Sequence, residues 1–304
     1  MSSVSSVFKD DLSAAVPSQD FPAPRAVRTN RSSLVRPRVM GILNLTPDSF
    51  SDGGIVESLE AALQRARELV AQGADVLDIG GESTRPRAEP VDEILEVARV
   101  VPAIRAIQAE LDIPISIDTM KPAVAEAAMA AGAWMWNDIT ALGFASDSLA
   151  TAAKLGCEVV LMHMQGEPAT MQNDPRYDDV VEEVASFLSE RARTAIAAGV
   201  PRERIWLDPG IGFGKTLHHN LALLANLDRF AALGFPLLVG ASRKGFIRAL
   251  DPGASDPGDR LGGSIAVALA AAQAGAAMVR VHDVRETAQA LMVAEAIHGA
   301  RADG

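Results

Sequence analysis

Eight short apolar segments alternate with helical segments along this chain, and this alternation restricts the possible folds more than any other feature. The apolar segments are residues 39–43, 76–79, 113–117, 133–136, 158–162, 205–207, 236–239 and 277–281. Strands and helices that alternate to the end of a chain predict a parallel sheet with its helices outside. Eight such repeats predict an α/β fold of the (β/α)8 TIM-barrel type with a parallel eight-stranded core. An open, doubly wound sheet is the alternative.

The helical patterns lie between the predicted strands. They cover residues 58–72, 92–110, 122–131, 146–154, 178–198, 217–232, 264–273 and 284–298. Glycines close six of them, and glycine adopts the left-handed conformation that commonly ends a helix. No linker interrupts residues 39–298, which predicts a single barrel domain over residues 38–300. Residues 1–37 are rich in Ser, Ala, Pro and Arg, and we expect them to be a flexible N-terminal extension.

Composition argues against several classes of protein. The chain has 304 residues, 48% of them hydrophobic, so it can bury a large core. Its net charge is -11, and an acidic chain is a poor candidate for binding a nucleic-acid backbone. The single cysteine, Cys157, cannot form an intramolecular disulfide. No apolar stretch has the length of a membrane span or of a secretory signal core, so we expect a cytoplasmic protein without a membrane partner.

A polar or charged group follows every predicted strand. In strand order these groups are Asn44, Asp78 with residues 80–86, Asp118, Asn137, His163, Asp208, residues 242–244 and His282, with Arg280 just inside the eighth strand. The carboxyl ends of the strands form the rim where barrel enzymes carry their active sites. A single polar residue there is often only a helix cap. A group of this kind at all eight strand ends predicts an active site.

These groups divide into two sets by their chemistry. The first could hold a phosphate or diphosphate, because arginine offers a two-pronged donor and hydroxyl and imidazole groups add further donors. It consists of Asn44, Thr84, Arg85, Ser242, Arg280 and His282, of which Asn44 also offers a neutral oxygen ligand for Mg²⁺. The second set suits a flat heterocycle, since carboxylates accept from its N–H groups and a lysine donates to its carbonyl. It consists of Asp118, Asn137, Asp208 and Lys244.

Two motifs allow other interpretations. Residues 208–216 follow a predicted strand and end in Gly-Lys-Thr, as in a nucleotide-binding P-loop. Pro209 stands at the first glycine position of that motif and has no N–H for a phosphate, so a tight turn close to a ligand is favoured. Lys244 could also form a Schiff base, as in barrel aldolases, but nothing else in the sequence supports that chemistry.

The motifs at the strand ends resemble those of dihydropteroate synthases, a family of pterin-binding TIM barrels. Residues 44–54, NLTPDSFSDGG, resemble the first loop of that family, and residues 80–86, GGESTRP, resemble the second loop. Residues 116–119, 137–139, 161–166, 208–215, 242–244 and 280–284 follow in the order of the family. The resemblance covers about residues 38–298, and Arg87 departs from it because a glycine is expected after Arg-Pro.

The resemblance implies that p-aminobenzoate displaces diphosphate from 6-hydroxymethyl-7,8-dihydropterin diphosphate, with Mg²⁺ as cofactor, to give 7,8-dihydropteroate in folate biosynthesis. It implies that the pterin is held by Asp118, Asn137, Asp208 and Lys244, with Met162 and Phe213 packing nearby. The diphosphate and Mg²⁺ would be held by Asn44, Arg280 and His282. The p-aminobenzoate would be framed by Phe50, Thr84, Arg85, Pro86 and Ser242. The residues expected to act in catalysis are Asp118, Asp208, Lys244 and Arg280.

Further expectations concern inhibitors, assembly and a rival function. Sulfonamides resemble p-aminobenzoate and should compete with it. The family resemblance implies a homodimer, for which the apolar helical segments 264–273 and 284–298 could supply the interface. Arg87 is expected to alter the second loop or its affinity for p-aminobenzoate, because arginine resists a tight turn that glycine allows. The alternative function is a pterin-binding methyltransferase domain that serves a corrinoid partner.

Overall fold

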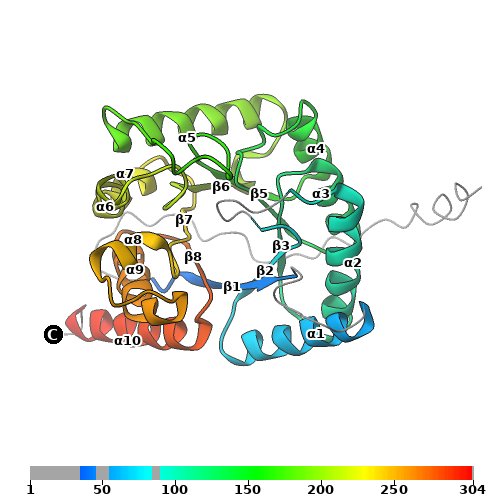
Figure 1. Cartoon of the computed structure of the whole chain (residues 1–304), viewed down its shortest axis with the longest axis horizontal. Helices are drawn as coiled ribbons and strands as arrows, with labels where there is room; N and C mark the ends of the chain where they lie inside the picture. Colours follow the sequence, from blue (N-terminus) through cyan, green and yellow to red (C-terminus); the bar gives the residue numbers. More distant parts are fainter. Residues whose placement is uncertain (1–34, 46–54, 84–89, 303–304) are drawn as a thin grey trace, which may run out of the picture.

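Eight parallel strands form the centre of the molecule, for which a computed structural model describes residues 35–45, 55–83 and 90–302. The strands are β1 Arg38–Asn44, β2 Val76–Gly80, β3 Ile115–Asp118, β4 Met135–Asp138, β5 Glu158–Met162, β6 Ile205–Asp208, β7 Leu238–Val239 and β8 Met278–Val281. They lie in the order β6-β5-β4-β3-β2-β1-β8-β7. A parallel bridge between Leu207 and Leu237 joins the two edges of this sheet. The predicted eight-stranded barrel is confirmed (Figure 1).

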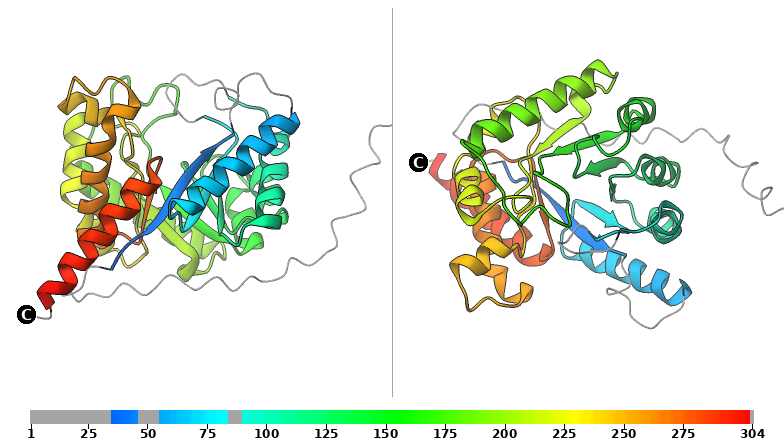
Figure 2. Two further views of the ribbon diagram at one scale, coloured as in Figure 1. Left: turned by 90° about the horizontal axis from the view of Figure 1, so that it is seen from below. Right: turned by 45° about the horizontal axis from the view of Figure 1, so that its top comes forward.

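Helices surround the strands, as Figures 1 and 2 show. They are α1 Ile55–Ala71, α2 Glu93–Glu110, α3 Pro122–Ala130, α4 Ser148–Leu155, α5 Val180–Ala197, α6 Leu217–Ala225, α7 Leu227–Ala231, α8 Gly245–Leu250, α9 Leu261–Gln273 and α10 Val284–Ala302, with short 3-10 helices η2 Arg202–Arg204 and η3 Pro257–Arg260. The packing of β1 between α1 and α10 depends on Gly41. A side chain there would come within 3.0 Å of Val284 and 3.5 Å of Leu69.

Alternate residues of each strand point into the barrel, because side chains alternate across a strand. One layer inside the barrel is apolar and consists of Met40, Val76, Met135, Val160, Trp206, Leu238 and Met278, all of them at most 1% exposed. The residues two positions further along five of these strands are Asp78, Asn137, Met162, Asp208 and Arg280. The apolar layer therefore fills the barrel toward the amino ends of the strands. The next layer, which is polar except for Met162, lies at their carboxyl ends.

The opposite end of the barrel has contacts of a structural kind. The indole Nε1 of Trp206 donates to Oε2 of the buried Glu158 over 2.6 Å. The guanidinium carbon of Arg38 lies 6.0 Å from the ring centre of Trp134. A buried carboxylate that accepts from an indole is satisfied without a ligand. We therefore place the chemistry at the carboxyl ends.

Some elements differ from those predicted. The expected helix over residues 217–232 is two helices, because the Asn226 side chain donates to the carbonyl oxygen of Ala222 over 2.8 Å and interrupts the helical pattern. β7 is shorter than predicted, since Pro236 has no N–H for the ladder and contributes only its carbonyl oxygen, 3.0 Å from Leu207 N. Helix α8 was not predicted.

Two expectations concern membranes and the N-terminus. Within residues 35–45, 55–83 and 90–302, none of the helices is long and apolar enough to cross a membrane. The expected extension over residues 1–37 lies outside the described residues except for its last three.

Candidate active site

Arg280 lies at the centre of an ion-pair network inside the barrel. From β8, its Nε donates to Oδ2 of Asp78 on β2 over 2.5 Å, and its Nη2 donates to Oδ2 of Asp118 on β3 over 2.6 Å. The same Asp78 oxygen accepts from Nδ2 of Asn137 on β4 over 3.3 Å. Four strands are connected in this way. Two carboxylates fix the position of the guanidinium, and among the described residues they leave other N–H groups of Arg280 for a ligand.

Burial changes the ionisation of this network. It raises the pKa of Asp118 to about 7, although the charge of Arg280 opposes the shift. Burial also acts to lower the pKa of Arg280, but the carboxylates of Asp78 and Asp118 outweigh it and raise that pKa, so the guanidinium stays charged. A buried carboxylate with a perturbed pKa beside a fixed cation is typical of functional sites.

Asp208, at the end of β6, lies on the other side of Arg280. Its Oδ1 accepts from the Gly210 N–H over 2.7 Å. A Cβ on Gly240 would lie 3.7 Å from Oδ2 of Asp208 and 3.6 Å from Cβ of Arg280, so these two residues flank the Gly240 backbone. Burial raises the pKa of Asp208, while the charge of Lys244 and the Gly210 N–H oppose the shift.

Lys244 lies in the turn before α8 and is a further charged residue of the site, beside Asp118, Asp208 and Arg280. Its ammonium lies 4.3 Å from the centre of the Phe213 ring, and its Nζ donates to the carbonyl oxygen of Ile211. Within the part of the chain that the structure describes, this contact leaves two of its three N–H groups for other acceptors. Burial lowers the pKa of Lys244 to about 8, and the carboxylate of Asp208 opposes that shift.

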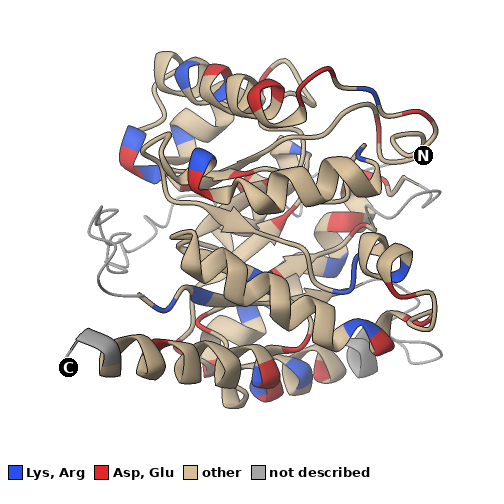
Figure 3. Ribbon diagram, turned by 90° about the vertical axis from the view of Figure 1, so that its left-hand side faces the viewer, with Lys and Arg blue, Asp and Glu red and all other residues tan. Residues whose placement is uncertain are grey.

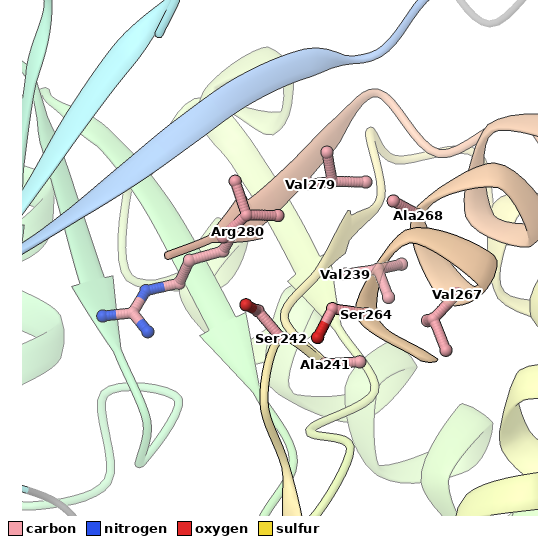
Figure 4. Close-up of a pocket in the computed structure, with 9 residues that line it drawn as sticks. Val239, Ala241, Ser242, Ser264, Val267, Ala268, Val279 and Arg280 are labelled. Atoms are coloured by element: carbon pink, nitrogen blue, oxygen red, sulfur yellow. The ribbon is translucent and has the colours of Figure 1, made fainter. Parts of the chain in front are cut away.

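Ser242 and His282 meet where β7 and β8 end. Oγ of Ser242 lies 3.0 Å from Nδ1 of His282 and accepts from its backbone N–H over 3.2 Å. A small cavity of about 10 Å³ lies behind Ser242, and Figure 4 shows Arg280 extending away from the apolar side chains around it. That volume holds at most one water. This cavity is therefore too small for a substrate, and Arg280 extends away from it into the barrel.

Asn44 ends β1 and is half-buried. Its Oδ1 lies 3.6 Å from the position of a Cβ on Gly80, at the end of the neighbouring strand. Among the described residues, no group of three or more His, Cys, Asp or Glu could hold a metal ion. Asn44 offers one neutral oxygen, which suits an ion whose other ligands are phosphate and water oxygens.

The sequence matches a family described as pterin binding enzyme over residues 40–282. The dihydropteroate synthase of Escherichia coli strain K12 is 48% identical to it over 269 residues, which is 88% of this chain and 94% of the relative. The chain belongs to the dihydropteroate synthase family. The resemblance predicted from the motifs at the strand ends is confirmed, and with it the prediction of a transferase.

Solved structures of dihydropteroate synthases have the same fold. A Yersinia pestis dihydropteroate synthase in a sulfonamide drug complex has a TM-score of 0.82 and 47% identity, over 88% of this chain and 96% of that one. A Xanthomonas albilineans dihydropteroate synthase with 4-aminobenzoic acid has a TM-score of 0.80 and 49% identity, over 87% and 94% of the two chains. The Xanthomonas enzyme with 7,8-dihydropteroate has a TM-score of 0.78 and 48% identity, over 87% and 95%.

The residues predicted for the dihydropteroate synthase site divide into those the structure places and those it does not describe. Asp118, Asn137, Asp208, Lys244 and Arg280 lie together at the carboxyl ends of the strands. Met162 is buried near them, with its Cγ 3.2 Å from the position of a Cβ on Gly210. Phe213 lies under Lys244, and Ser242 and His282 contact each other. Phe50, Thr84, Arg85, Pro86 and Arg87 lie outside the described residues.

Sequence reasoning gave no role to three residues of the dihydropteroate synthase site that the structure brings into it. Asp78 holds Arg280 and Asn137 together. Nζ of the buried Lys215 lies 3.0 Å from Nδ1 of His163 and donates to the carbonyl oxygen of Phe213 over 2.9 Å. Burial lowers the pKa of Lys215 to about 7 and that of His163 to about 3. Asp78 and His163 had been recognised as polar groups at strand ends, and the position of Asp78 inside an apolar strand is the signal that could have given it a role.

Proposed function

We propose that this chain carries out the reaction of its family with the residues of the network around Arg280. The substrates would be 6-hydroxymethyl-7,8-dihydropterin diphosphate and p-aminobenzoate, and the products 7,8-dihydropteroate and diphosphate. The observation that supports these roles best is the contact of Arg280 with Asp78 and Asp118 inside the barrel. Buried carboxylates and a buried guanidinium in this arrangement suit a polar heterocycle with an anionic leaving group.

The pterin would bind between Asp118, Asp208 and Lys244. The carboxylates would accept from the amine and ring N–H groups, and Asn137 would add an amide that both donates and accepts. Lys244 would donate to the pterin carbonyl with an N–H group that Ile211 does not use. Met162 and Phe213 would pack against the flat ring.

In the transfer step, the bond from the exocyclic carbon of the pterin to the diphosphate oxygen breaks and a bond to the amine nitrogen forms. The nitrogen then loses a proton to water or to the released diphosphate. Arg280 and His282 would bind the leaving anion, and Arg280 remains charged throughout. Asp118 and Asp208 would stabilise positive charge that develops on the pterin as the leaving group departs. An aryl amine is neutral and needs no strong base.

Mg²⁺ would bind at Asn44 together with the diphosphate oxygens. The donor set fits such an ion, because one neutral oxygen from the protein leaves most of the coordination to phosphate and water. When bound, the ion would neutralise charge on the diphosphate and make it a better leaving group. Omission of Mg²⁺ should therefore weaken binding of the diphosphate substrate more than binding of p-aminobenzoate.

The p-aminobenzoate would lie beside Ser242, framed by Phe50, Thr84, Arg85 and Pro86. The Xanthomonas relative solved with 4-aminobenzoic acid and the Yersinia relative solved with a sulfonamide support this choice of ligands. Sulfonamides should inhibit this chain, and added p-aminobenzoate should relieve the inhibition. Inhibition that p-aminobenzoate does not relieve would contradict a shared pocket.

The reaction can be tested with the unmodified protein. Incubation with dihydropterin diphosphate, p-aminobenzoate and Mg²⁺ should yield dihydropteroate and diphosphate in equal amounts. The alternative function, methyl transfer from a methylated pterin to a corrinoid partner, is not favoured, because the relatives are dihydropteroate synthases. Methyl transfer without dihydropteroate formation would overturn the proposal.

We also propose that the chain forms a homodimer through α9 and α10. A groove of about 440 Å³ lies between these helices, lined by Ile265, Leu269, Glu286, Gln289, Ala290, Val293, Ala294 and Ile297. Val293 and Ile297 are 54% and 52% exposed. In Figure 3 the last helix carries few charged residues along its length. A second copy of the chain would cover this apolar face, as exposed apolar patches commonly mark interfaces.

A cytoplasmic location stays a prediction.

A further inference from the structure

Lys121 lies in a buried charged cluster that the proposed reaction does not use. Its ammonium donates to Oε2 of Glu82 over 2.8 Å, to Oε2 of Glu96 over 2.6 Å and to the carbonyl oxygen of Val91 over 2.7 Å. The side chains of Lys121 and Glu82 are each 8% exposed, and that of Glu96 is fully buried. All three N–H groups of the lysine are used by acceptors of this chain. No donor therefore remains for a substrate.

The cluster joins the two stems of the second loop. Glu82 precedes residues 84–89 and Val91 follows them, and Oε1 of Glu82 accepts from the Val91 N–H over 2.9 Å. The first stem also rests on α2, because Arg99 donates to the Gly81 carbonyl oxygen over 2.8 Å. A side chain on Gly81 would come within 2.9 Å of Cγ of Glu96, so this contact requires glycine. Lys121 thus contacts both stems and the helix under them.

The same lysine belongs to the turn after β3, next to the pterin side of the site. Its backbone N–H donates to Oγ1 of Thr119 over 3.2 Å. The backbone of Thr119 has contacts that do not involve the ammonium, because its carbonyl oxygen accepts from Nε1 of Trp136 over 2.8 Å and its N–H donates to the Asn137 carbonyl oxygen over 3.1 Å. The end of β3, with Asp118, should therefore keep its position when the ammonium of Lys121 is removed.

We propose that Lys121 is a positioning residue for p-aminobenzoate, because it fixes both stems of the second loop relative to β3. This inference rests on the proposed function, in which Thr84, Arg85 and Pro86 of that loop frame p-aminobenzoate. Lys121 acts through Glu82 and Val91 and touches neither substrate. Its removal changes the p-aminobenzoate side of the site and leaves the pterin side in place.

Two variants and a matched control test this role. Lys121→Met removes the ammonium and keeps much of the side-chain volume. Glu82→Gln removes only the charge of the carboxylate that contacts both Lys121 and the Val91 N–H. Glu158→Gln is the control, since it also removes a buried carboxylate contact but lies at the opposite end of the barrel. KM for each substrate is measured with the other saturating, and Tm is measured for each variant.

Lys121→Met should raise KM for p-aminobenzoate by about tenfold and leave KM for dihydropterin diphosphate within about twofold. Glu82→Gln should produce a smaller change of the same kind, and Glu158→Gln should lower Tm without changing either KM. Equal changes in both KM values, or none, would overturn the inference. If Lys121→Met does not fold, Glu82→Gln decides by the same criterion. Failure of this inference can be distinguished from failure of the proposed function, because in the second case the unmodified protein would form no dihydropteroate.

Discussion

Asp118 and Lys244 are charged residues whose pKa values burial moves toward neutrality. The pKa of Asp118 is raised to about 7, and that of Lys244 is lowered to about 8. Because the two pKa values move toward each other, the pH range over which the carboxylate and the ammonium are both charged is narrower than for exposed groups. A site that needs Asp118 as an acceptor and Lys244 as a donor should therefore work best in a narrow pH range.

Lys244→Arg tests the upper limit of that range. The ammonium of Lys244 loses its proton as the pH rises through about 8, so kcat/KM for dihydropterin diphosphate should fall above that pH. Arginine stays charged, and the alkaline limb should move up by at least about 2 pH units, even though the rate is lower. Lys154→Arg, at an exposed lysine, is the control. An alkaline limb near pH 8 in Lys244→Arg would contradict the assignment.

Individual site residues could be predicted where they follow a strand, as Asn137, Asp208 and Lys244 do. The position of each at the end of a predicted strand placed it at the rim of the barrel without any knowledge of its contacts, and its role stays a proposal. The role of Asp78 was harder to predict, because this residue lies inside an apolar strand and its contact with Arg280 joins residues 202 positions apart. The roles of Lys121 and Lys215 depend on contacts between different loops, which no local pattern in the sequence reveals.

At the scale of elements, the turn after β6 is packed backbone against backbone on the segment after β5. Gly210 has a φ of 67°, and a Cβ there would lie 1.9 Å from the carbonyl oxygen of His163. Gly214 has a φ of 61°, and a Cβ there would lie 2.3 Å from the carbonyl oxygen of Gln165. The turn carries Phe213 and the Ile211 carbonyl oxygen, which contact Lys244. Its glycines therefore fix the lysine that we assign to the pterin.

Gly210→Ala should destabilise the protein and reduce activity, with Gly156→Ala as its control. Gly156 has a similar φ of 58° at the end of α4, but a Cβ there meets nothing within 4 Å. The control should lose about 1–2 kcal/mol of unfolding free energy, from the left-handed backbone alone. Gly210→Ala should lose about 1–3 kcal/mol more, because the added methyl clashes with backbone. Urea unfolding measures both, and equal losses would show that the close packing is unimportant.

The order and type of most elements could be predicted because strand and helix periodicities differ and glycines mark helix ends. The break at Asn226 and the short helix α8 could not, because they depend on a side-chain hydrogen bond and on packing beside β7. The stems of the second loop also depend on distant partners, since Lys121 contacts Glu82 from 39 positions away.

At the scale of the whole molecule, the apolar face of α9 and α10 is the feature that the barrel itself does not explain. Both helices already pack on the strands and on each other, yet Met292, Val293 and Ile297 remain about half exposed. Helices that serve only the barrel normally carry polar residues on the outer face. This is why we infer a second copy of the chain at this surface.

Val293→Glu combined with Ile297→Glu should convert the proposed dimer to a monomer, because a charge on each side chain would be buried without a partner. Light scattering coupled to size-exclusion chromatography measures the mass of each protein. Ile94→Glu, at an 81% exposed position on α2, should leave the dimer intact. A monomeric unmodified protein, or a dimer that survives both substitutions, would rule out this interface.

The central claim is that the charged residues at the carboxyl ends of the barrel strands perform the transfer, and Asp118→Asn tests it most directly. The variant keeps the size of the side chain and removes the charge proposed to stabilise the pterin. Dihydropteroate formation should fall by about 100-fold or more, with Tm close to that of the unmodified protein and with Asp112→Asn, at an exposed loop residue, fully active. Turnover by Asp118→Asn within about threefold of the unmodified enzyme would contradict the claim.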